Sequence, residues 1–257
     1  MDKRIGAQYY TIRDYIGTIK DFEASCKKIS DIGYKAVQIS GTPLAASDMR
    51  KVLVEYGLEV YTTHRAFEDF IKNPEEIMEY NRILGSDLCG VGSMPGEYRK
   101  TANDLSRFIE QANRICGLFK KENMFFGYHN HDFEFSKVDG KLIFDRLADE
   151  TDPETFNFIF DTYWCQAGGK NPAKTIEKLG KRAMALHFKD YAVCQDDVCS
   201  KPQMAEIGEG NLDWDDIISA AEKAGSRWAL VEQDICSGDP FDSLKMSYDY
   251  LSAKGFF

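Results

Sequence analysis

The sequence predicts a (β/α)8 TIM barrel that forms one domain over residues 1–257, with its active site at the carboxyl ends of the strands. Two observations predict this α/β fold. Eight short apolar segments alternate with eight segments of helical period along the chain. The length of 257 residues also suits such a barrel, which commonly forms one domain of about 250 residues. A doubly wound open sheet is the alternative, but no GxGxxG motif follows the first strand-like segment.

The expected strands are short runs rich in apolar, β-branched and aromatic residues. Several of them end in polar residues, which is typical of barrel strands whose carboxyl ends carry a site. In chain order the runs cover residues 5–9, 36–39, 59–64, 88–91, 124–131, 156–161, 183–188 and 228–232.

The segments between these runs have the spacing and the boundary residues of helices. Apolar residues recur at helical period over 19–29 and again over 105–119. Asn-Pro pairs at 73–74 and 171–172 place a capping residue before a proline at the first helical position. Glycines that can adopt a left-handed C-cap lie shortly before five of the strands, at Gly33, Gly57, Gly85, Gly180 and Gly225.

Composition narrows the classes of partner. With 42 acidic and 32 basic residues the net charge is -10, which disfavours nucleic acid and anionic membranes as partners. The amino terminus lacks the apolar region of a signal peptide, and no run is long and apolar enough to cross a bilayer. We therefore expect a cytoplasmic protein whose seven cysteines, Cys199 among them, are reduced thiols, and which can form a homo-oligomer.

All four histidines lie at, or just past, the end of a strand-like run. Since the carboxyl ends of barrel strands meet at one mouth, these side chains should converge there with nearby acids. Alternation along a strand should place His129 and His131 on one face, and likewise His187 and Lys189. Imidazoles and carboxylates together favour a divalent-metal site of mixed nitrogen and oxygen ligands. The residues concerned are His64, His129, His131, Asp161, His187, Lys189 and Glu232.

Six segments resemble the sugar phosphate isomerase/epimerase group of xylose-isomerase-like barrels. They are AQYYTIRD (7–14), GYHNHDFEF (127–135), IFDTYW (159–164), LHFKD (186–190), IGEGNLDW (207–214) and LVEQD (230–234). The resemblance implies one divalent ion, manganese, cobalt, zinc or magnesium, held by Asp161, His187 and Glu232. The fourth ligand in that group is usually a glutamate ending strand five. His129 takes that place here, with His131 and Glu134 as alternatives.

The resemblance implies an isomerase or epimerase that removes a proton next to the carbonyl of a sugar, keto-sugar or cyclitol, with Glu232 as the base. A metal-bound imidazole has no free lone pair, so His129 could not act as a second base. Inversion of the sugar carbon would then need Glu134, His64 or Lys189 as the acid on the other face of the sugar. The alternative is a dehydratase or lyase that performs β-elimination on a 3-keto-sugar or 3-keto-glycoside, for which one base suffices.

Two further classes of function are less favoured. Metal-dependent nucleases that act at abasic DNA share the barrel, but they use a basic face and a richer metal cluster, which the net charge of -10 and four histidines do not support. A non-catalytic barrel that binds a sugar is the remote alternative.

The resemblance also implies substrate contacts. Glu134 is expected to contact the substrate or act as an acid or base, which is favoured over the alternative of a solvated residue in the loop after strand five. Lys189 is expected to hold a substrate oxygen or stabilise an enolate, unless it pairs with Asp190 or Glu209. The remaining expected contacts form the pocket wall and rim: His64, His131, Trp164, Gln8, Tyr10, Arg13 and Glu209.

Overall fold

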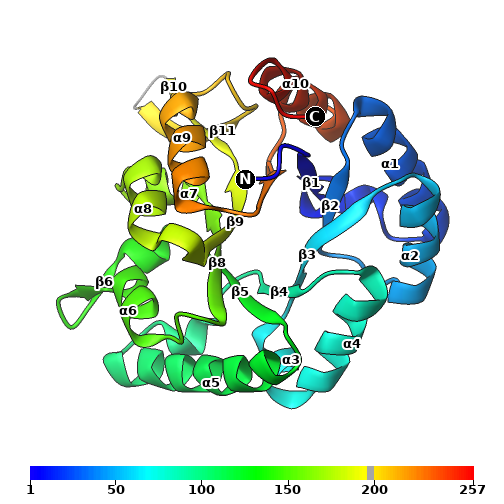
Figure 1. The fold of residues 1–257 in the computed structure, drawn as a ribbon. Helices are drawn as coiled ribbons and strands as arrows, with labels where there is room; N and C mark the ends of the chain where they lie inside the picture. Colours follow the sequence, from blue (N-terminus) through cyan, green and yellow to red (C-terminus); the bar gives the residue numbers. More distant parts are fainter. Residues whose placement is uncertain (196–199) are drawn as a thin grey trace.

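Eight parallel strands close into a barrel in the computed structural model, which describes residues 1–195 and 200–257 (Figure 1). The barrel order is β1, β2, β3, β4, β5, β8, β9 and β12, so consecutive strands are neighbours and β12 closes onto β1. This confirms the predicted TIM barrel. The strands are β1 Gly6–Gln8, β2 Ala36–Ile39, β3 Glu59–Arg65, β4 Leu88–Val91, β5 Phe125–His129, β8 Phe156–Asp161, β9 Ala183–Phe188 and β12 Trp228–Val231.

Four strands differ from the prediction by one or two residues at their carboxyl ends, and a side-chain hydrogen bond gives the reason at two of them. The fifth strand ends at His129, because the His131 amide donates to the Glu134 carboxylate rather than to a neighbouring strand. The prediction that His129 and His131 share a strand face is therefore wrong. The first strand ends at Gln8, whose side chain accepts from the Tyr10 amide and starts the 3-10 helix η1 Tyr9–Tyr15. A strand continued to Tyr10 would place this side chain on the same face as Gln8, but Tyr10 lies in η1 instead.

The helices surround the barrel (Figure 1). Two crossovers carry a pair of helices each, which makes ten α-helices among the described residues instead of the eight predicted segments. Asn171 caps its helix as expected, and Gly85 and Gly225 end theirs in left-handed conformation. The helices are α1 Ile19–Ile32, α2 Ala46–Glu55, α3 Phe67–Lys72, α4 Pro74–Leu84, α5 Ala102–Lys121, α6 Ile143–Glu150, α7 Thr162–Ala167, α8 Pro172–Leu179, α9 Trp214–Ala224 and α10 Pro240–Ala253.

Two antiparallel hairpins, which the sequence did not predict, are inserted in the loops. β6 Lys137–Val138 pairs with β7 Lys141–Leu142, and β10 Asp190–Gln195 pairs with β11 Ser200–Ala205 directly after β9. The six cysteines of the described part are all free, as expected, and Cys199 lies outside the described residues.

The barrel interior divides into an apolar and a polar layer. One layer is filled by side chains such as Tyr61, Leu88, Ile159 and Leu230. Glycines provide the space for them, because a Cβ on Gly127 would lie 2.9 Å from the Ile159 side chain. Inward positions two residues further along the strands are polar and buried: Gln8, Gln38, His129, Asp161, His187 and Glu232. Strand alternation therefore places a polar site directly on top of an apolar floor.

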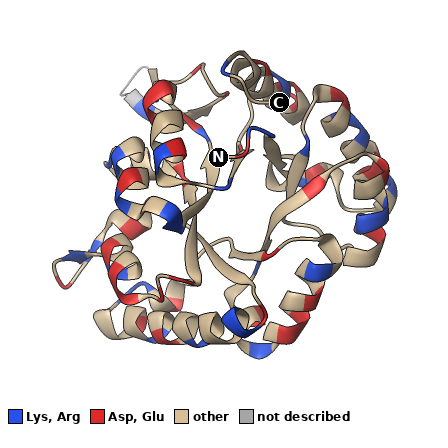
Figure 2. Cartoon of the chain, in the orientation of Figure 1, with Lys and Arg blue, Asp and Glu red and all other residues tan. Residues whose placement is uncertain are grey.

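The outer surface carries acidic and basic residues interspersed over the helices (Figure 2). Among the described residues, no helix is long and apolar enough to span a bilayer. The expectation that nucleic acid is not a partner stays a prediction.

Candidate metal centre

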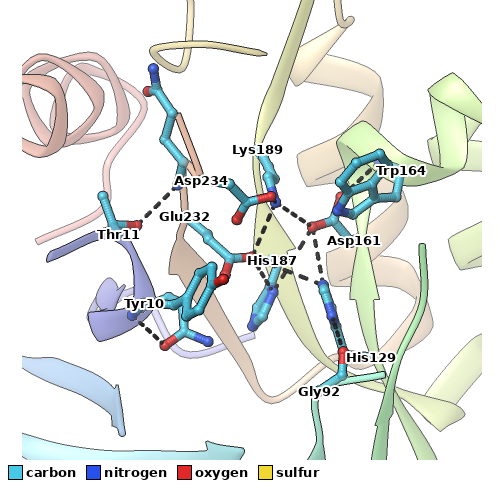
Figure 3. Close-up of polar contacts among 12 residues, drawn as sticks. Tyr10, Thr11, Gly92, His129, Asp161, Trp164, His187, Lys189, Glu232 and Asp234 are labelled. Atoms are coloured by element: carbon cyan, nitrogen blue, oxygen red, sulfur yellow. Dashed lines mark hydrogen bonds and ion pairs between the residues drawn. The ribbon is translucent and has the colours of Figure 1, made fainter. Parts of the chain in front are cut away.

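Four buried side chains from adjacent strands meet inside the mouth of the barrel (Figure 3). They are His129 at the end of β5, Asp161 at the end of β8, His187 on β9 and Glu232 just after β12, and their ligand atoms lie within 4.8 Å of one another. His129 Nε2 is 3.2 Å from Asp161 Oδ2, and His187 Nδ1 is 2.8 Å from Glu232 Oε2. The structure thus brings together the four residues predicted as metal ligands.

Each imidazole is oriented by a hydrogen bond on its far side. His129 Nδ1 lies 3.0 Å from the carbonyl oxygen of Gly92, which can only accept, so this nitrogen carries the proton. His187 Nε2 lies 2.7 Å from Gln38 Oε1 and likewise donates. In the neutral rings the lone pairs of His129 Nε2 and His187 Nδ1 then face the carboxylates. Such outer hydrogen bonds are typical of metal-binding histidines.

This arrangement fits a cation. A bare imidazole nitrogen facing a carboxylate oxygen sets two acceptors against each other, and His187 Nδ1 indeed makes no hydrogen bond within the described residues. A divalent ion bound by two imidazoles and two carboxylates would satisfy all four groups. Without an ion, a proton on the His129 imidazole would take its place. Burial opposes this protonation, but Asp161 and Glu232 raise the pKa of His129.

Lys189 adds a buried ammonium group to the cluster. Its Nζ lies 2.7 Å from Asp234, 3.4 Å from Glu232 and 3.6 Å from Asp161. Burial opposes the charge of Lys189, but the three carboxylates raise its pKa, and it in turn holds the pKa of Glu232 well below its usual range against the effect of burial. The ionised carboxylates exceed this one cation by two charges, which a divalent ion would balance.

The alternative partners considered for Lys189 are wrong. Asp190 accepts instead from the backbone amides of Gly208 and Gly210 and from the indole of Trp214, so it anchors the loop before α9. Glu209 is exposed and lies away from Lys189, in a neighbouring hollow.

Asp161 has two functions at once. Its Oδ1 accepts from the Trp164 amide and caps α7, while its Oδ2 faces the imidazoles. The Asn130 side-chain oxygen Oδ1 accepts from the Asp161 backbone amide at 3.0 Å. Capping α7 and facing the imidazoles are therefore compatible, and the cap holds the carboxylate in a fixed orientation.

The central cavity above the cluster has a volume of about 630 Å³. Of the predicted rim and wall residues, Tyr10, Arg13, His64 and His131 line it together with His129 and Glu232. Gln8 is buried beneath it, whereas Trp164 and Glu209 line the neighbouring hollow. The roles of these residues toward a substrate stay predictions.

His64 presents a hydrogen-bond donor at the cavity. Gln8 Oε1 accepts from the Tyr10 amide, so Gln8 Nε2 points toward His64 Nδ1, 3.5 Å away, and the proton of a neutral His64 lies on Nε2. That nitrogen has no partner within the described residues. Gly90 leaves the space for the ring, because a Cβ there would lie 2.8 Å from it.

Three site residues were missed or misjudged from the sequence. Gln38 orients His187, and its only signal was a polar residue inside an apolar strand. Asp234 binds Lys189, and its signal was its place two residues after Glu232. Glu134 is fully buried rather than solvated, and its carboxylate accepts from the Tyr128 hydroxyl and the His131 amide. This position favours holding the His131 loop, and its acid or base role stays a prediction.

We expect Gln38→Leu to weaken metal binding. Without the amide oxygen, His187 loses the hydrogen bond that keeps Nδ1 directed at the cluster, and losses of this kind cost about 10–100-fold in metal affinity. Titration of chelator-treated protein with manganese measures the effect. Gln203→Leu, on the exposed hairpin, is the matched control and should retain the parent affinity. Equal affinity in parent and Gln38→Leu would contradict this orienting role.

Glu134 should give the protein a pH-dependent stability. Burial, the largest effect, raises its pKa to about 7, so between pH 4.5 and 7 the folded state keeps a proton that the unfolded state has lost. The free energy of unfolding should therefore fall as pH rises through this window, by up to about 3 kcal/mol. Urea denaturation of parent and Glu134→Gln from pH 4 to 8 measures the difference.

The Glu134→Gln variant should lack this contribution, whereas the exposed Glu122→Gln should keep it. A difference between parent and Glu134→Gln that does not change with pH would rule out the raised pKa.

Comparison with known proteins agrees with this geometry. Residues 26–251 match the family model of the xylose isomerase-like TIM barrel. An inosose dehydratase of Lacticaseibacillus casei is 26% identical over 171 residues, which cover 61% of this chain and 54% of that protein. The chain therefore matches only about half the length of that relative. An inosose dehydratase of Geobacillus thermodenitrificans is 24% identical over 84% of this chain and 78% of its own length.

Among solved structures, a sugar phosphate isomerase/epimerase from Parabacteroides distasonis superposes with a TM-score of 0.79 at 23% identity. The superposition covers 98% of this chain and 95% of that one. At this identity the likeness supports the fold.

Proposed function

The chain belongs to the xylose isomerase-like TIM barrel family, and from this premise we propose that it is a divalent-metal-dependent enzyme that removes the proton next to a carbonyl group of a sugar, keto-sugar or cyclitol. The observation that carries the proposal is the buried cluster of two imidazoles and two carboxylates at the floor of an open cavity. Its oriented lone pairs and its excess of negative charge suit a divalent ion.

Each residue of the cluster has a separate task in this proposal. His129, Asp161, His187 and Glu232 would hold the ion, which when bound would polarise the carbonyl group and acidify the neighbouring C–H bond. Glu232 is the base: its Oε2 faces His187 and Lys189, so Oε1 is the oxygen left to take the proton.

Lys189 and His64 would act on substrate oxygens. The Lys189 ammonium, held charged by the carboxylates around it, stabilises negative charge that develops on the carbonyl oxygen. His64 Nε2 offers a donor to a hydroxyl group of the substrate. Both groups are fixed by protein contacts before a substrate arrives, which lowers the cost of ordering them.

Within this class we favour elimination, that is, dehydration or loss of a β-linked group. Isomerisation or epimerisation, which the family resemblance led us to expect, needs a second group that returns a proton on the opposite face. Here the strand-five position holds His129, whose two nitrogens are occupied by the Gly92 carbonyl and by the cluster. Elimination needs only the base Glu232, and the curated relatives above are dehydratases.

The proposal is tested in two steps. Protein purified without chelator should contain a divalent metal, and added manganese, cobalt or zinc should raise the melting temperature of chelator-treated protein. The metal-loaded protein is then incubated with keto-sugars and keto-cyclitols in deuterated water. An enone product supports elimination, and an epimer carrying solvent deuterium supports epimerisation. The proposed chemistry would be overturned if the protein bound no metal, or if it formed neither an enone nor a deuterated epimer. Binding of a sugar without turnover would indicate a sugar-binding barrel.

A further inference from the structure

A second hollow, of about 650 Å³, lies beside the central cavity of about 630 Å³. Four segments form it: the start of α7, the β10–β11 hairpin, the loop after β11 and the loop after β12. Ile235 lines both hollows, so the second one opens at the same mouth as the first. The residues that matter for its chemistry are Tyr163, Trp164, Val193, Met204, Gln233 and Ile235.

Trp164 separates this hollow from the metal centre. Its ring lines the second hollow, yet its centroid is 5.3 Å from Lys189 Nζ and 5.3 Å from the His131 ring of the central cavity. Figure 3 shows Trp164 beside Asp161 and Lys189. Lys189 Nζ is in turn only 3.4 Å from Glu232. The second hollow is therefore separated from the proposed base by little more than the Trp164 ring. A molecule held in the central cavity can therefore extend into it.

The lining of the second hollow favours an uncharged ring. Tyr163, Trp164 and Met204 offer apolar and aromatic surface, and the apolar rim is open, with Val193 53% and Ile235 73% exposed. Glu206 and Glu209 line the second hollow, and none of its described lining residues is lysine or arginine. This distribution of charge disfavours an anionic ligand.

Besides the two glutamates, the polar side chains that line the second hollow are those of Tyr163, Gln203, Gln233 and Ser237. The Gln233 side-chain nitrogen Nε2 donates to Glu206 Oε1 at 3.3 Å and to the Ile235 carbonyl oxygen at 3.2 Å, which fixes it in place. Trp164 Nε1 is buried without a partner in the described part of the chain.

We propose that this second hollow is a subsite for an uncharged ring, aromatic or apolar, that the substrate carries beside its reacting sugar ring. The inference rests on the proposed function and narrows its substrate class to glycosides of keto-sugars. A free monosaccharide or a sugar phosphate would leave the hollow empty or bring charge to its acidic rim.

Binding of stable analogues tests the subsite without requiring turnover. Calorimetry on the manganese-loaded full chain compares matched 4-nitrophenyl and methyl glycosides of glucose, galactose and xylose. In at least one pair the aryl compound should bind about tenfold more tightly, since one buried ring contributes this much. Val193→Asp and, independently, Met204→Ala should reduce that ratio to below about threefold. Val54→Asp, the same change at an exposed valine on α2, should retain it.

Equal binding within every pair, no binding of any aryl glycoside, or an unchanged ratio in both hollow variants would overturn the subsite. The proposed function fails by a different result, namely the absence of metal binding or of an enone or deuterated product from any keto-sugar. A preference for aryl glycosides without turnover would keep the subsite and remove the chemistry. Turnover together with equal affinity for both members of each pair would keep the proposed chemistry and remove the subsite.

Discussion

Replacement of Glu232 by glutamine should lower kcat by about 10²–10⁴-fold, the usual contribution of a positioned general base. Glutamine keeps an oxygen near the metal position but has no basic carboxylate. In the parent, the Lys189 ammonium holds the pKa of Glu232 well below its usual range against the effect of burial, so this carboxylate is ionised across the neutral range. The variant should therefore lose turnover while it keeps most of its capacity to bind a divalent ion.

Two measurements separate a lost base from a lost metal site. Elemental analysis after dialysis reports the metal content, and single-turnover kinetics report the rate of proton removal. Glu59→Gln is the control, because Glu59 begins β3 at the opposite end of the barrel and pairs with Arg4 at the surface. If Glu232→Gln turned over within threefold of the parent rate, the base would be another group. If metal content and turnover fell together, the experiment would identify a ligand rather than a base.

The barrel could be predicted because its signal is local and repeated. Eight apolar runs alternate with helical segments, and two Asn-Pro pairs and five glycines mark several of their boundaries, so an error at one boundary does not change the architecture. The same pattern indicated a wider set of seven polar residues near strand ends, and the family resemblance selected the four candidate ligands from it. Residues that end strands are thus the part of a barrel site that a sequence can indicate.

Contacts between distant segments could not be predicted in this way. Gln38 and His187 are 149 residues apart, and only the closure of the barrel brings β2 opposite β9. The Glu134 carboxylate folds back onto the His131 amide, which ends β5 two residues earlier than the apolar pattern indicates. The hairpin after β9 replaces what looked like a loop. The first two depend on side-chain hydrogen bonds, about which strand or helix periodicity carries no information, and the third depends on backbone pairing of β10 with β11.

Lys189→Met should destabilise the metal-free protein by about 3–5 kcal/mol, the usual cost of leaving buried charges without their partner. Lys189 is fully buried, and its ammonium group lies within 3.6 Å of the carboxylates of Asp161, Glu232 and Asp234. Methionine fills a similar volume, so the loss would reflect the charge more than a cavity. Urea denaturation of chelator-treated protein measures it.

A bound divalent ion should recover part of this loss, because it supplies positive charge at the same cluster. The rise in melting temperature on adding manganese should therefore be larger in Lys189→Met than in the parent. Lys178→Met is the matched control: Lys178 pairs with Asp145 at the surface, where an ion pair contributes about 1 kcal/mol or less, and its response to manganese should equal that of the parent. If metal-free Lys189→Met were as stable as the parent, the ammonium would not be what balances the carboxylates. A smaller response to manganese in this variant would show instead that Lys189 helps to build the metal site, because it keeps Asp161 and Glu232 in place.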